Sequence, residues 1–270
     1  MRTGGPSDTH NRHKIAFNEH VKDAIRISDI VIELMDARNA NESRIPEMEE
    51  YVAEMKKKLI FVITKIDLVS SKELKESLSS LNLENPILIS SLTKQGISGL
   101  RERIIIESKR LKQKRKTHIT LVGYPNTGKS TLINILVRRN AAPVSSQPGW
   151  TKSIRKIRFN RDIAIIDVPG VIRSKENLFQ GSADLIKHSR IGVQVPESVR
   201  EPDLIAFEIM KENPGLIENH YSLPKEEDSE LFLEKLAKKL GFIKKRSLPD
   251  IDRTARQVLK DWQKGLFRKN

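Results

Sequence analysis

The chain has 270 residues, 49 of them lysine or arginine against 35 acidic residues, which gives a formal net charge of +14. This length suits one large domain or two of ordinary size, and the charge favours polyanionic partners, nucleic acid before an anionic membrane surface. The sequence has no cysteine, which excludes disulfides and thiol chemistry, and no apolar run long enough for a membrane-spanning helix. Because its first residues, MRTGGPSDTHNRHK, also contain no apolar signal core, we expect a cytoplasmic protein that does not enter a membrane.

The first 111 residues alternate between helical and extended patterns. Apolar residues at helical spacing predict helices, and short β-branched runs bounded by polar residues predict strands. In chain order we expect a helix over 14–27, a strand over 30–37, a helix over 45–58, a strand over 59–64, a helix over 71–80, a strand over 86–90 and a helix over 96–111. Such alternation predicts a parallel sheet with helices on its faces.

A basic segment, KRLKQKRK, follows over residues 109–116 and holds six basic residues in eight. It has two readings at this stage. One is a solvated helix end or linker, and the other is a segment that contacts phosphates.

The sheet pattern then resumes. Residues 117–123 predict a strand, 128–140 a helix, and 154–160 and 161–167 two neighbouring strands. Together with the earlier elements, they predict one doubly wound, mostly parallel sheet.

Beyond about residue 172 the pattern becomes helical. Asp203, Asp228 and Asp250 are candidate helix starts and Gly241 a candidate helix stop. We therefore expect a domain over 1–175 that contains the sheet, and an all-helical domain over 176–270. Residues 235–270 hold 12 basic and 3 acidic residues, a density that favours RNA binding. The expected helices lie over 182–191, 201–212, 228–242 and 250–267.

The stretch Gly123-Tyr-Pro-Asn-Thr-Gly-Lys-Ser130 matches the phosphate-binding loop motif in full, between an expected strand and an expected helix. In such a loop the backbone N–H groups wrap a phosphate, and the helix start adds positive potential. Lys129 should reach the β and γ phosphates, and the Ser130 hydroxyl should hold Mg²⁺. The expected phosphate-binding residues are Asn126, Thr127, Gly128, Lys129, Ser130 and Thr131.

Two further segments complete a triphosphate site. Asp167-Val-Pro-Gly170 ends an expected strand, so Asp167 would bind Mg²⁺ through a water molecule and the Gly170 N–H would sense the γ phosphate. Between the two motifs lies QPGWTKS, whose Thr151 is the candidate switch threonine that closes on Mg²⁺. The competing readings are an ordinary D-x-P-G turn and a surface threonine.

The base-reading motif stands earlier in the chain. The expected strand over 59–64 ends in Thr64-Lys65-Ile66-Asp67, and the carboxylate of Asp67 can accept hydrogen bonds from guanine N1–H and its 2-amino group. Adenine offers neither donor, so the carboxylate would be left unpaired, and such sites can discriminate by as much as ~10⁴–10⁵. The stem of Lys65 can cover the base. The loop at Ser90 and Ser91, one helix later, can offer a backbone N–H to guanine O6.

The order of the motifs is therefore base motif, base-contact loop, phosphate loop, switch threonine and D-x-P-G. This is a circular permutation of the usual GTPase order. A sheet tolerates it when the cut falls in a loop and a linker, here residues 109–116, joins the former ends.

With these residues in place, the chain resembles the circularly permuted GTPases of the YlqF/RbgA type, which help to mature the large ribosomal subunit. The resemblance covers nearly the whole length and includes DAR (36–38), TKID, GYPNTGKS, PGWT, DVPG and the C-terminal DIDRTARQVLKDWQKGLF. It implies a P-loop GTPase sheet with permuted motifs, a helical C-terminal domain, GTP hydrolysis with Mg²⁺, binding to rRNA or the pre-ribosomal particle, and stimulation by that particle.

The sequence departs from this family at two places. Thr64 stands where the family usually has asparagine, and since threonine lacks an amide we expect it not to bridge the neighbouring loops and to lower nucleotide affinity. The family's F-P-G-H-M element is missing as written, and its histidine falls on His13, the candidate catalytic group. The competing reading of His13 is a solvent-exposed side chain.

The catalytic partner is the least determined part of the site. The glutamine that positions water in other GTPases is replaced by Val171, as the resemblance predicts, so slow intrinsic hydrolysis is expected. Asn126 is similar to the asparagine that holds K⁺ in potassium-activated GTPases, which makes K⁺ a candidate cofactor.

Three functions from different classes remain open. The first is a GTP-hydrolysing switch that binds rRNA or the precursor of the large ribosomal subunit and assists its assembly. The second is a nucleotide-gated RNA-binding module with negligible turnover, and the third an ATPase or kinase, against which Asp67 argues. No amphipathic segment supports a membrane role, and no obligate protein partner can be inferred.

Overall fold

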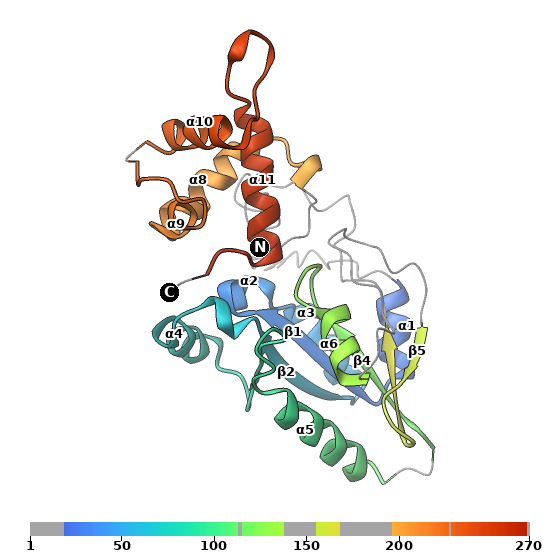
Figure 1. Ribbon diagram of the computed structural model, residues 1–270. Coiled ribbons are helices and arrows are strands. Elements are labelled where there is room, and N and C mark those ends of the chain that lie inside the picture. The colour runs from blue at the N-terminus through green and yellow to red at the C-terminus, as the bar shows by residue number, and fades with distance from the viewer. Residues whose placement is uncertain (1–18, 113–114, 138–154, 168–195, 227, 269–270) are drawn as a thin grey trace, which may run out of the picture.

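A single six-stranded sheet organises the first two thirds of the chain, and a separate group of helices follows it (Figure 1). The computed structural model describes residues 19–112, 115–137, 155–167, 196–226 and 228–268. The strand order is β3-β2-β1-β4-β6-β5, with all neighbours parallel except β5 and β6. The strands are β1 (Ile30–Asp36), β2 (Lys58–Thr64), β3 (Ile87–Leu88), β4 (Thr117–Val122), β5 (Arg155–Arg158) and β6 (Ile163–Asp167).

Helices cover both faces of the sheet, and a second set forms the C-terminal helical region. The sheet helices are α1 (Glu19–Ile27), α2 (Ala40–Ser43), α3 (Pro46–Glu54), α4 (Ser71–Leu81), α5 (Ile97–Arg110) and α6 (Lys129–Val137). The helical region contains α8 (Pro202–Glu212), α9 (Leu216–His220), α10 (Ser229–Leu240) and α11 (Ile251–Lys264). Short 3₁₀ turns lie at η1 (Ala37–Asn39), η2 (Ile66–Leu68), η4 (Pro196–Ser198) and η5 (Lys245–Ser247).

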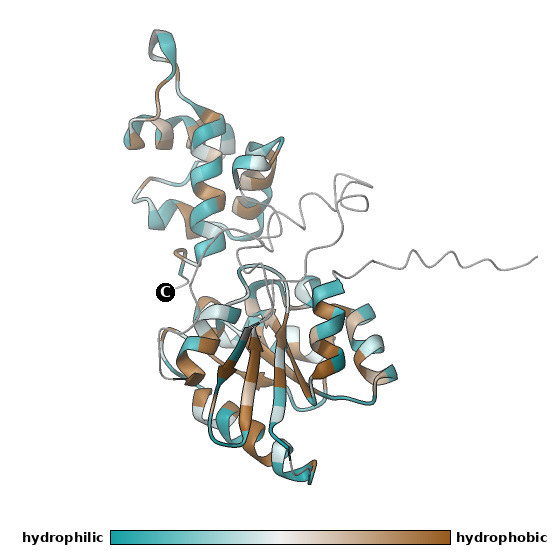
Figure 2. Cartoon of the chain, turned by 90° about the vertical axis from the view of Figure 1, so that its right-hand side faces the viewer, coloured by the Kyte–Doolittle hydropathy of each residue, from teal (hydrophilic) through white to brown (hydrophobic). Residues whose placement is uncertain are grey.

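The central strand β1 shows why this sheet needs helices on both sides. All seven of its residues are buried. Ile30, Ile32 and Leu34 pack toward α5 and α6, and the alternate residue Val31 packs with α1 and α3. A strand buried on both faces is typical of parallel sheets, and Figure 2 shows hydrophobic colour concentrated in the strands.

The helical region has its own hydrophobic core. Phe232 and Leu233 from α10 pack against Val258 and Trp262 from α11 and against residues of α8 and α9. Burial of this apolar surface, at roughly 25 cal/mol per Å², is what holds short helices together, because isolated helices of this length are marginal in water. None of the helices in the described part of the chain is long and apolar enough to cross a membrane.

Most of the predicted elements are confirmed. Asp228 and Asp250 cap α10 and α11 by accepting a backbone N–H, and Gly241 ends α10 in a left-handed conformation. The predicted start signal Asp203 lies in the first turn of α8, while Glu201 is the N-cap and Pro202 occupies the first helical position. The helix expected over 182–191 and the proposed boundary at 175/176 lie outside the described residues.

Two differences concern the sheet. The strand expected over 86–90 shrinks to Ile87–Leu88, because it lies at the edge and pairs with β2 alone. Immediately after β1, a segment for which no helix or strand was predicted forms η1 and α2. Both differences lie beside the candidate site.

Candidate nucleotide-binding site

The predicted base and phosphate motifs meet at one edge of the sheet. Thr64 ends β2, the phosphate loop follows β4, and Asp36 ends β1 between them. Carboxyl ends of neighbouring parallel strands lie at the same edge, where α/β proteins hold their ligands. Although the phosphate loop comes some sixty residues after Thr64 in sequence, the strand order makes the two loops near neighbours.

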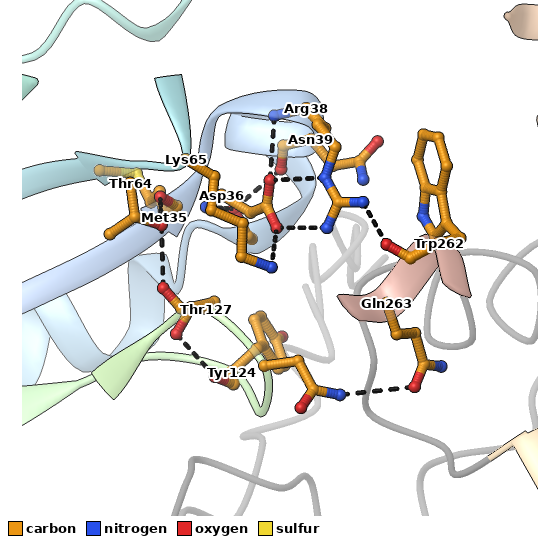
Figure 3. A network of polar contacts seen from close by, with 12 residues as sticks. Met35, Asp36, Arg38, Asn39, Thr64, Lys65, Tyr124, Thr127, Trp262 and Gln263 are labelled. Carbon is orange, nitrogen blue, oxygen red and sulfur yellow. Dashed lines mark hydrogen bonds and ion pairs between the residues drawn. The ribbon is translucent and has the colours of Figure 1, made fainter. Parts of the chain in front are cut away.

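Thr64 joins these loops through its hydroxyl. The Thr64 Oγ1 atom is 2.8 Å from the carbonyl oxygen of Thr127 in the phosphate loop and 3.0 Å from that of Met35 at the end of β1 (Figure 3). The residue is buried, so these contacts are shielded from water. The expectation that threonine cannot bridge the loops is therefore wrong, because its short hydroxyl reaches the carbonyls directly.

The residues after Thr64 adopt a tight turn. Lys65 has a left-handed backbone with φ of 58°, and residues 66–68 form η2. The Ile66 side chain is buried in the core with Met35 and Ile63, so only its backbone can face a base. Asp67 is half-buried, as a carboxylate that must accept from a bound base requires.

The base-contact loop is tied to this turn. The Ile66 N–H donates to the Ile89 carbonyl at 3.3 Å, and the Ile89 N–H donates to the Ile63 carbonyl at 2.8 Å. Ser90 is fully buried, and its N–H donates to the Gln95 carbonyl at 3.1 Å. Because that N–H is used within the loop, Ser91, which is half-buried, is the better placed of the two serines to contact guanine O6.

The phosphate loop has the backbone that its motif requires. Gly123 has φ of +151°, and an added Cβ would lie 2.6 Å from the Leu34 carbonyl oxygen. Asn126 and Gly128 also have positive φ, at 63° and 95°. The loop therefore turns sharply away from β4 before α6 begins at Lys129.

The Lys129 ammonium donates to the carbonyl oxygens of Gly123 and Tyr124 at 2.8 and 2.6 Å. It thus lies folded within its own loop, and it would have to turn outward to reach a triphosphate. Ser130 and Thr131 lie half-buried in the first turn of α6. This turn offers the N–H groups and positive potential that favour an anion.

A buried ionic cluster lies beside the base motif (Figure 3). Asp36 accepts from the Arg38 side chain in a two-pronged arrangement, at 3.0 Å to Oδ1 and 2.7 Å to Oδ2, and its Oδ2 lies 2.9 Å from Lys65 Nζ. Burial acts to raise the pKa of Asp36, but Arg38 and Lys65 together hold it well below its ordinary value. Burial lowers the pKa of Lys65, and Asp36 offsets part of this effect.

The C-terminal end of α11 contacts this cluster from the helical region. Arg38 donates to the carbonyl oxygen of Trp262 and stacks on its ring, with the guanidinium carbon 4.6 Å from the ring centroid. Sequence reasoning noted DAR at 36–38 without giving it a role, and it did not identify Trp262. The position of DAR directly after β1, at the site's edge, is the signal that could have indicated its place.

Two more contacts join the same helix end to the site. Asn126 in the phosphate loop donates its side-chain amide to Gln263 Oε1 at 3.4 Å. Gly265, which ends α11, lies so close to Leu68 that an added Cβ would be 2.7 Å from Leu68 Cδ1. The loops that follow β1, β2 and β4 thus each contact residues 262–265.

A cleft of about 480 Å³ opens between α4 and the helical region. Arg38 and Trp262 line it, together with Glu73 and Glu76. None of the predicted base or phosphate residues that the structure describes lines this cleft. It is therefore a neighbour of the candidate nucleotide site rather than the site itself.

Several predicted residues cannot be placed. His13, Thr151, Gly170 and Val171 lie outside the described residues. Asp167 ends β6, which pairs with β4 next to the phosphate loop, so its backbone reaches the same edge of the sheet. A serine hydroxyl from α6 and a carboxylate at the end of β6 are oxygen ligands of the kind that Mg²⁺ prefers, so these two residues fit a magnesium site.

The family model described as "50S ribosome-binding GTPase" matches residues 118–244, which include the phosphate loop and much of the helical region. An uncharacterized GTP-binding protein of Methanocaldococcus jannaschii is 30% identical over 253 residues, which are 93% of this chain and 66% of that protein. Nucleolar GTP-binding protein 2 of Neurospora crassa is 34% identical over 267 residues, 95% of this chain and 42% of that protein. The chain thus spans between two fifths and two thirds of these relatives' length.

The fold is also found among solved structures. The crystal structure of GNP-bound YlqF from T. maritima superposes with a TM-score of 0.61 at 23% identity, covering 92% of this chain and 93% of that one. The GDP-bound structure of the same protein gives a TM-score of 0.59 at 22% identity. The likeness extends over both the sheet and the helical region.

Proposed function

Since the chain is a circularly permuted GTPase of the YlqF type in its fold and in the order of its motifs, we propose that it is a GTP-hydrolysing switch that binds rRNA within pre-ribosomal particles and assists assembly of the large subunit. The observation that carries the proposal is the Thr64 contact, which holds the base motif against the phosphate loop. One nucleotide can then touch both motifs. We place this function where large subunits are assembled, which is the cytoplasm in a cell that has no nucleolus.

Guanine specificity rests on Asp67. Its carboxylate accepts from the two guanine donors, the stem of Lys65 covers the base, and the Ser91 N–H meets O6. The tie between Ile66 and Ile89 supports this arrangement, because it fixes the two base loops relative to each other. Preorganised loops lose less entropy when the ligand binds.

Phosphate binding rests on the loop and the start of α6. Lys129 releases the two loop carbonyls and turns to the β and γ phosphates, while the N–H groups of residues 126–131 surround them. Ser130, Thr151 and Asp167 would hold Mg²⁺, Asp167 through a water molecule. Bound there, Mg²⁺ supplies positive charge that neutralises the phosphate oxygens. Gly170 senses the γ phosphate.

Potassium is a further proposed cofactor at Asn126. Its amide nitrogen is the donor to Gln263, an arrangement that is compatible with the amide oxygen facing a cation. With Val171 in place of the water-positioning glutamine, intrinsic hydrolysis is slow, and the ribosomal particle supplies the missing group or positions His13.

The helical region is the proposed RNA-binding part, and residues 262–265 couple it to the nucleotide. These residues contact the loops that carry the base and the phosphates. A change of nucleotide at those loops therefore biases the contact with α11, which is the requirement for a switch.

Val171 favours one second candidate, a nucleotide-gated RNA-binding module with negligible turnover, because valine cannot orient a water molecule. GTP turnover in K⁺ buffer, with and without large ribosomal subunits, separates the two functions. Stimulation by the subunits supports the assembly switch. Tight GTP binding without stimulated turnover supports the gated binder.

Matched variants make this test specific. Lys129→Ala should abolish triphosphate binding and turnover, because the loop loses its one lysine. Lys75→Ala, at an exposed position on α4, should leave both unchanged. If Lys129→Ala retains normal turnover, the phosphate site is elsewhere and the proposal fails.

A further inference from the structure

A basic groove lies at the end of the sheet opposite the nucleotide loops. It has a volume of about 610 Å³ and is formed by the end of α5, the residues that lead into β4, and the hairpin between β5 and β6, at the lower end of the molecule in Figure 1. Because β4 is six residues long and the phosphate loop follows its far end, the two sites lie roughly 20 Å apart along the strand. Six basic residues line the groove: Lys109, Lys112, Arg115, Lys116, Arg158 and Arg161.

The positive charge of this groove is largely unused within the fold. All six basic side chains are exposed, and Asp162 is the one acidic residue in the described part of the chain that lines the groove with them. Within the described part of the chain, Arg115 alone among the six has an ion pair, with Asp29 at 2.6 Å. That pair anchors the segment before β4 to the start of β1 and leaves the other five cations to repel one another.

The pKa of the neighbouring His118 is affected by the same positive charges. Its pKa is lowered by burial and then by the positive charges of Lys156, Arg115 and Lys116, with Asp29 acting in the opposite sense. A cluster of like charges destabilises a fold unless an anion neutralises it. The groove therefore has the character of an anion site that is completed by a partner.

The shape and composition of the groove indicate which anion it fits. The cations come from separate segments: Lys109 lies at the end of α5 and Lys112 just after it, and Arg158 and Arg161 belong to the hairpin. Cations from different segments around one groove match a ribbon of phosphates better than a flat membrane surface. Among the residues that the structure describes, no aromatic side chain lines the groove, so these residues offer no platform on which unpaired bases could stack. Contacts confined to the backbone position a helix without reading its sequence.

We propose that this groove binds the sugar-phosphate backbone of an RNA helix, as a second RNA contact at the end of the molecule opposite the helical region. The inference rests on the proposed function for the kind of nucleic acid and goes beyond it in the surface used. It also gives a role to the linker that the permutation requires: residues 109–116 join the two halves of the sheet and supply four of the six basic residues. Two contacts on one chain would raise the affinity for a folded RNA by avidity.

The test compares two triple variants of the full chain with the same loss of charge. The groove variant carries Lys109→Gln, Lys112→Gln and Arg161→Gln. The control variant carries Lys56→Gln, Lys72→Gln and Lys75→Gln, at exposed positions on and near α3 and α4. Binding of a blunt RNA duplex of two helical turns is measured against salt concentration. The groove variant should bind at least about tenfold more weakly, with a salt slope smaller by about three, since each phosphate contact contributes about one.

The control variant should stay within about twofold of the unmodified chain, and both variants should bind GTP normally. Equal losses in the two variants would overturn the groove while leaving RNA binding by the helical region intact. Failure of the unmodified chain to bind the duplex at all would overturn the groove and the RNA part of the proposed function together, without touching GTP binding. A loss confined to phosphatidylserine vesicles would assign the groove to membranes and overturn the proposal.

Discussion

The guanidinium of Arg38 lies over the ring of Trp262, and this contact joins two parts of the chain that are more than 220 positions apart. The same guanidinium holds Asp36, which in turn holds Lys65 of the base motif. A continuous set of contacts therefore runs from the base motif to the end of α11. Its members are all largely buried, so each contact is protected from competition by water.

The Arg38→Lys variant should weaken this connection. Lysine keeps the charge but cannot make the two-pronged contact with Asp36 or stack in the same way. We expect a loss of about 1–3 kcal/mol in the free energy of unfolding, measured by denaturant titration. Arg26→Lys is the matched control, because Arg26 forms an exposed pair with Asp23 and its replacement should leave the free energy of unfolding nearly unchanged. Equal losses of stability in the two variants would show that the buried cluster contributes no more to the free energy of unfolding than an exposed ion pair.

Thr64→Val should separate the base motif from the phosphate loop with little change in shape. The carbonyl oxygens of Met35 and Thr127 lose the hydroxyl they share, at a cost of about 1–1.5 kcal/mol. If loop spacing matters for binding, the Kd for GTP should rise about tenfold, as measured by titration calorimetry. Thr64→Ser keeps the hydroxyl and should bind nearly as well as the unmodified chain. Unchanged GTP affinity in the valine variant would show that the Thr64 hydroxyl has no role in nucleotide binding.

Asp67→Asn should exchange the base preference. The amide of asparagine can donate a hydrogen bond to the 2-oxo group of xanthine. Guanine, in contrast, loses the carboxylate that accepted hydrogen bonds from its N1–H and 2-amino groups. GTP affinity should fall by about 100-fold or more, and xanthosine triphosphate should now compete in a displacement assay. Asp162→Asn, near the groove at the other end of the sheet, should change neither. Absence of any gain for xanthosine triphosphate would count against Asp67 as the base reader.

The burial of Glu33 should make the free energy of unfolding depend on pH. Burial raises its pKa well above the ordinary value, and Glu49 adds to this, against the opposing effects of the Ile45 N–H and Arg44. The folded state therefore keeps this proton at pH values where the unfolded chain has released it. The contribution to stability is full below the unfolded pKa, near 4.5, and is lost as pH rises through the folded pKa.

Glu33→Gln removes this titration while keeping an acceptor for the Ile45 N–H. The fall in the free energy of unfolding as the pH rises above the ordinary glutamate pKa of 4.5 should become shallower in the variant, as measured by urea titration at each pH. Glu54→Gln, at an exposed position on α3, should leave the unmodified profile. Superimposable profiles for Glu33→Gln and the unmodified chain would contradict the assignment.

Gly96→Ala should damage the base-contact loop. Gly96 has φ of +72°, and an added Cβ would lie 1.9 Å from the Leu88 carbonyl oxygen, so the loop has to move. We expect a loss of more than about 2 kcal/mol of stability, from the left-handed backbone and the clash together. Gly99→Ala, within α5 and with nothing within 4 Å, should instead stabilise by about 0.5–1 kcal/mol. Thermal unfolding of both variants provides the comparison.

The sequence predicted the sheet because its signals are local. Buried strands such as β1 and β2 are short apolar runs, and an N-cap residue such as Asp250 can be recognised because it stands directly before the helix that it begins. The permuted motif order was also readable, since each motif lies within a few residues of its strand. These features need no knowledge of distant parts of the chain.

The contacts around the site could not be predicted in this way. Nothing near Trp262 in sequence indicates that its ring meets Arg38, because the contact depends on how the helical region lies on the sheet. The bridging role of Thr64 was missed for a related reason, since its partner carbonyl belongs to a loop some sixty residues later. The position of β3 at the edge of the sheet, which explains why it is short, is likewise a property of the assembled sheet.

The division of the sheet has one more consequence. Strands β1, β2 and β3 come from residues 30–88 and strands β4, β5 and β6 from residues 117–167. In the described sheet the two sets of strands pair with each other through β1 and β4, from Ile30 opposite Ile119 to Glu33 opposite Val122. A protease cut between α5 and β4 would yield one fragment that carries the base reader and another that carries the phosphate loop. Such fragments are natural candidates for complementation, and GTP, held by both, would act as the ligand that draws them together.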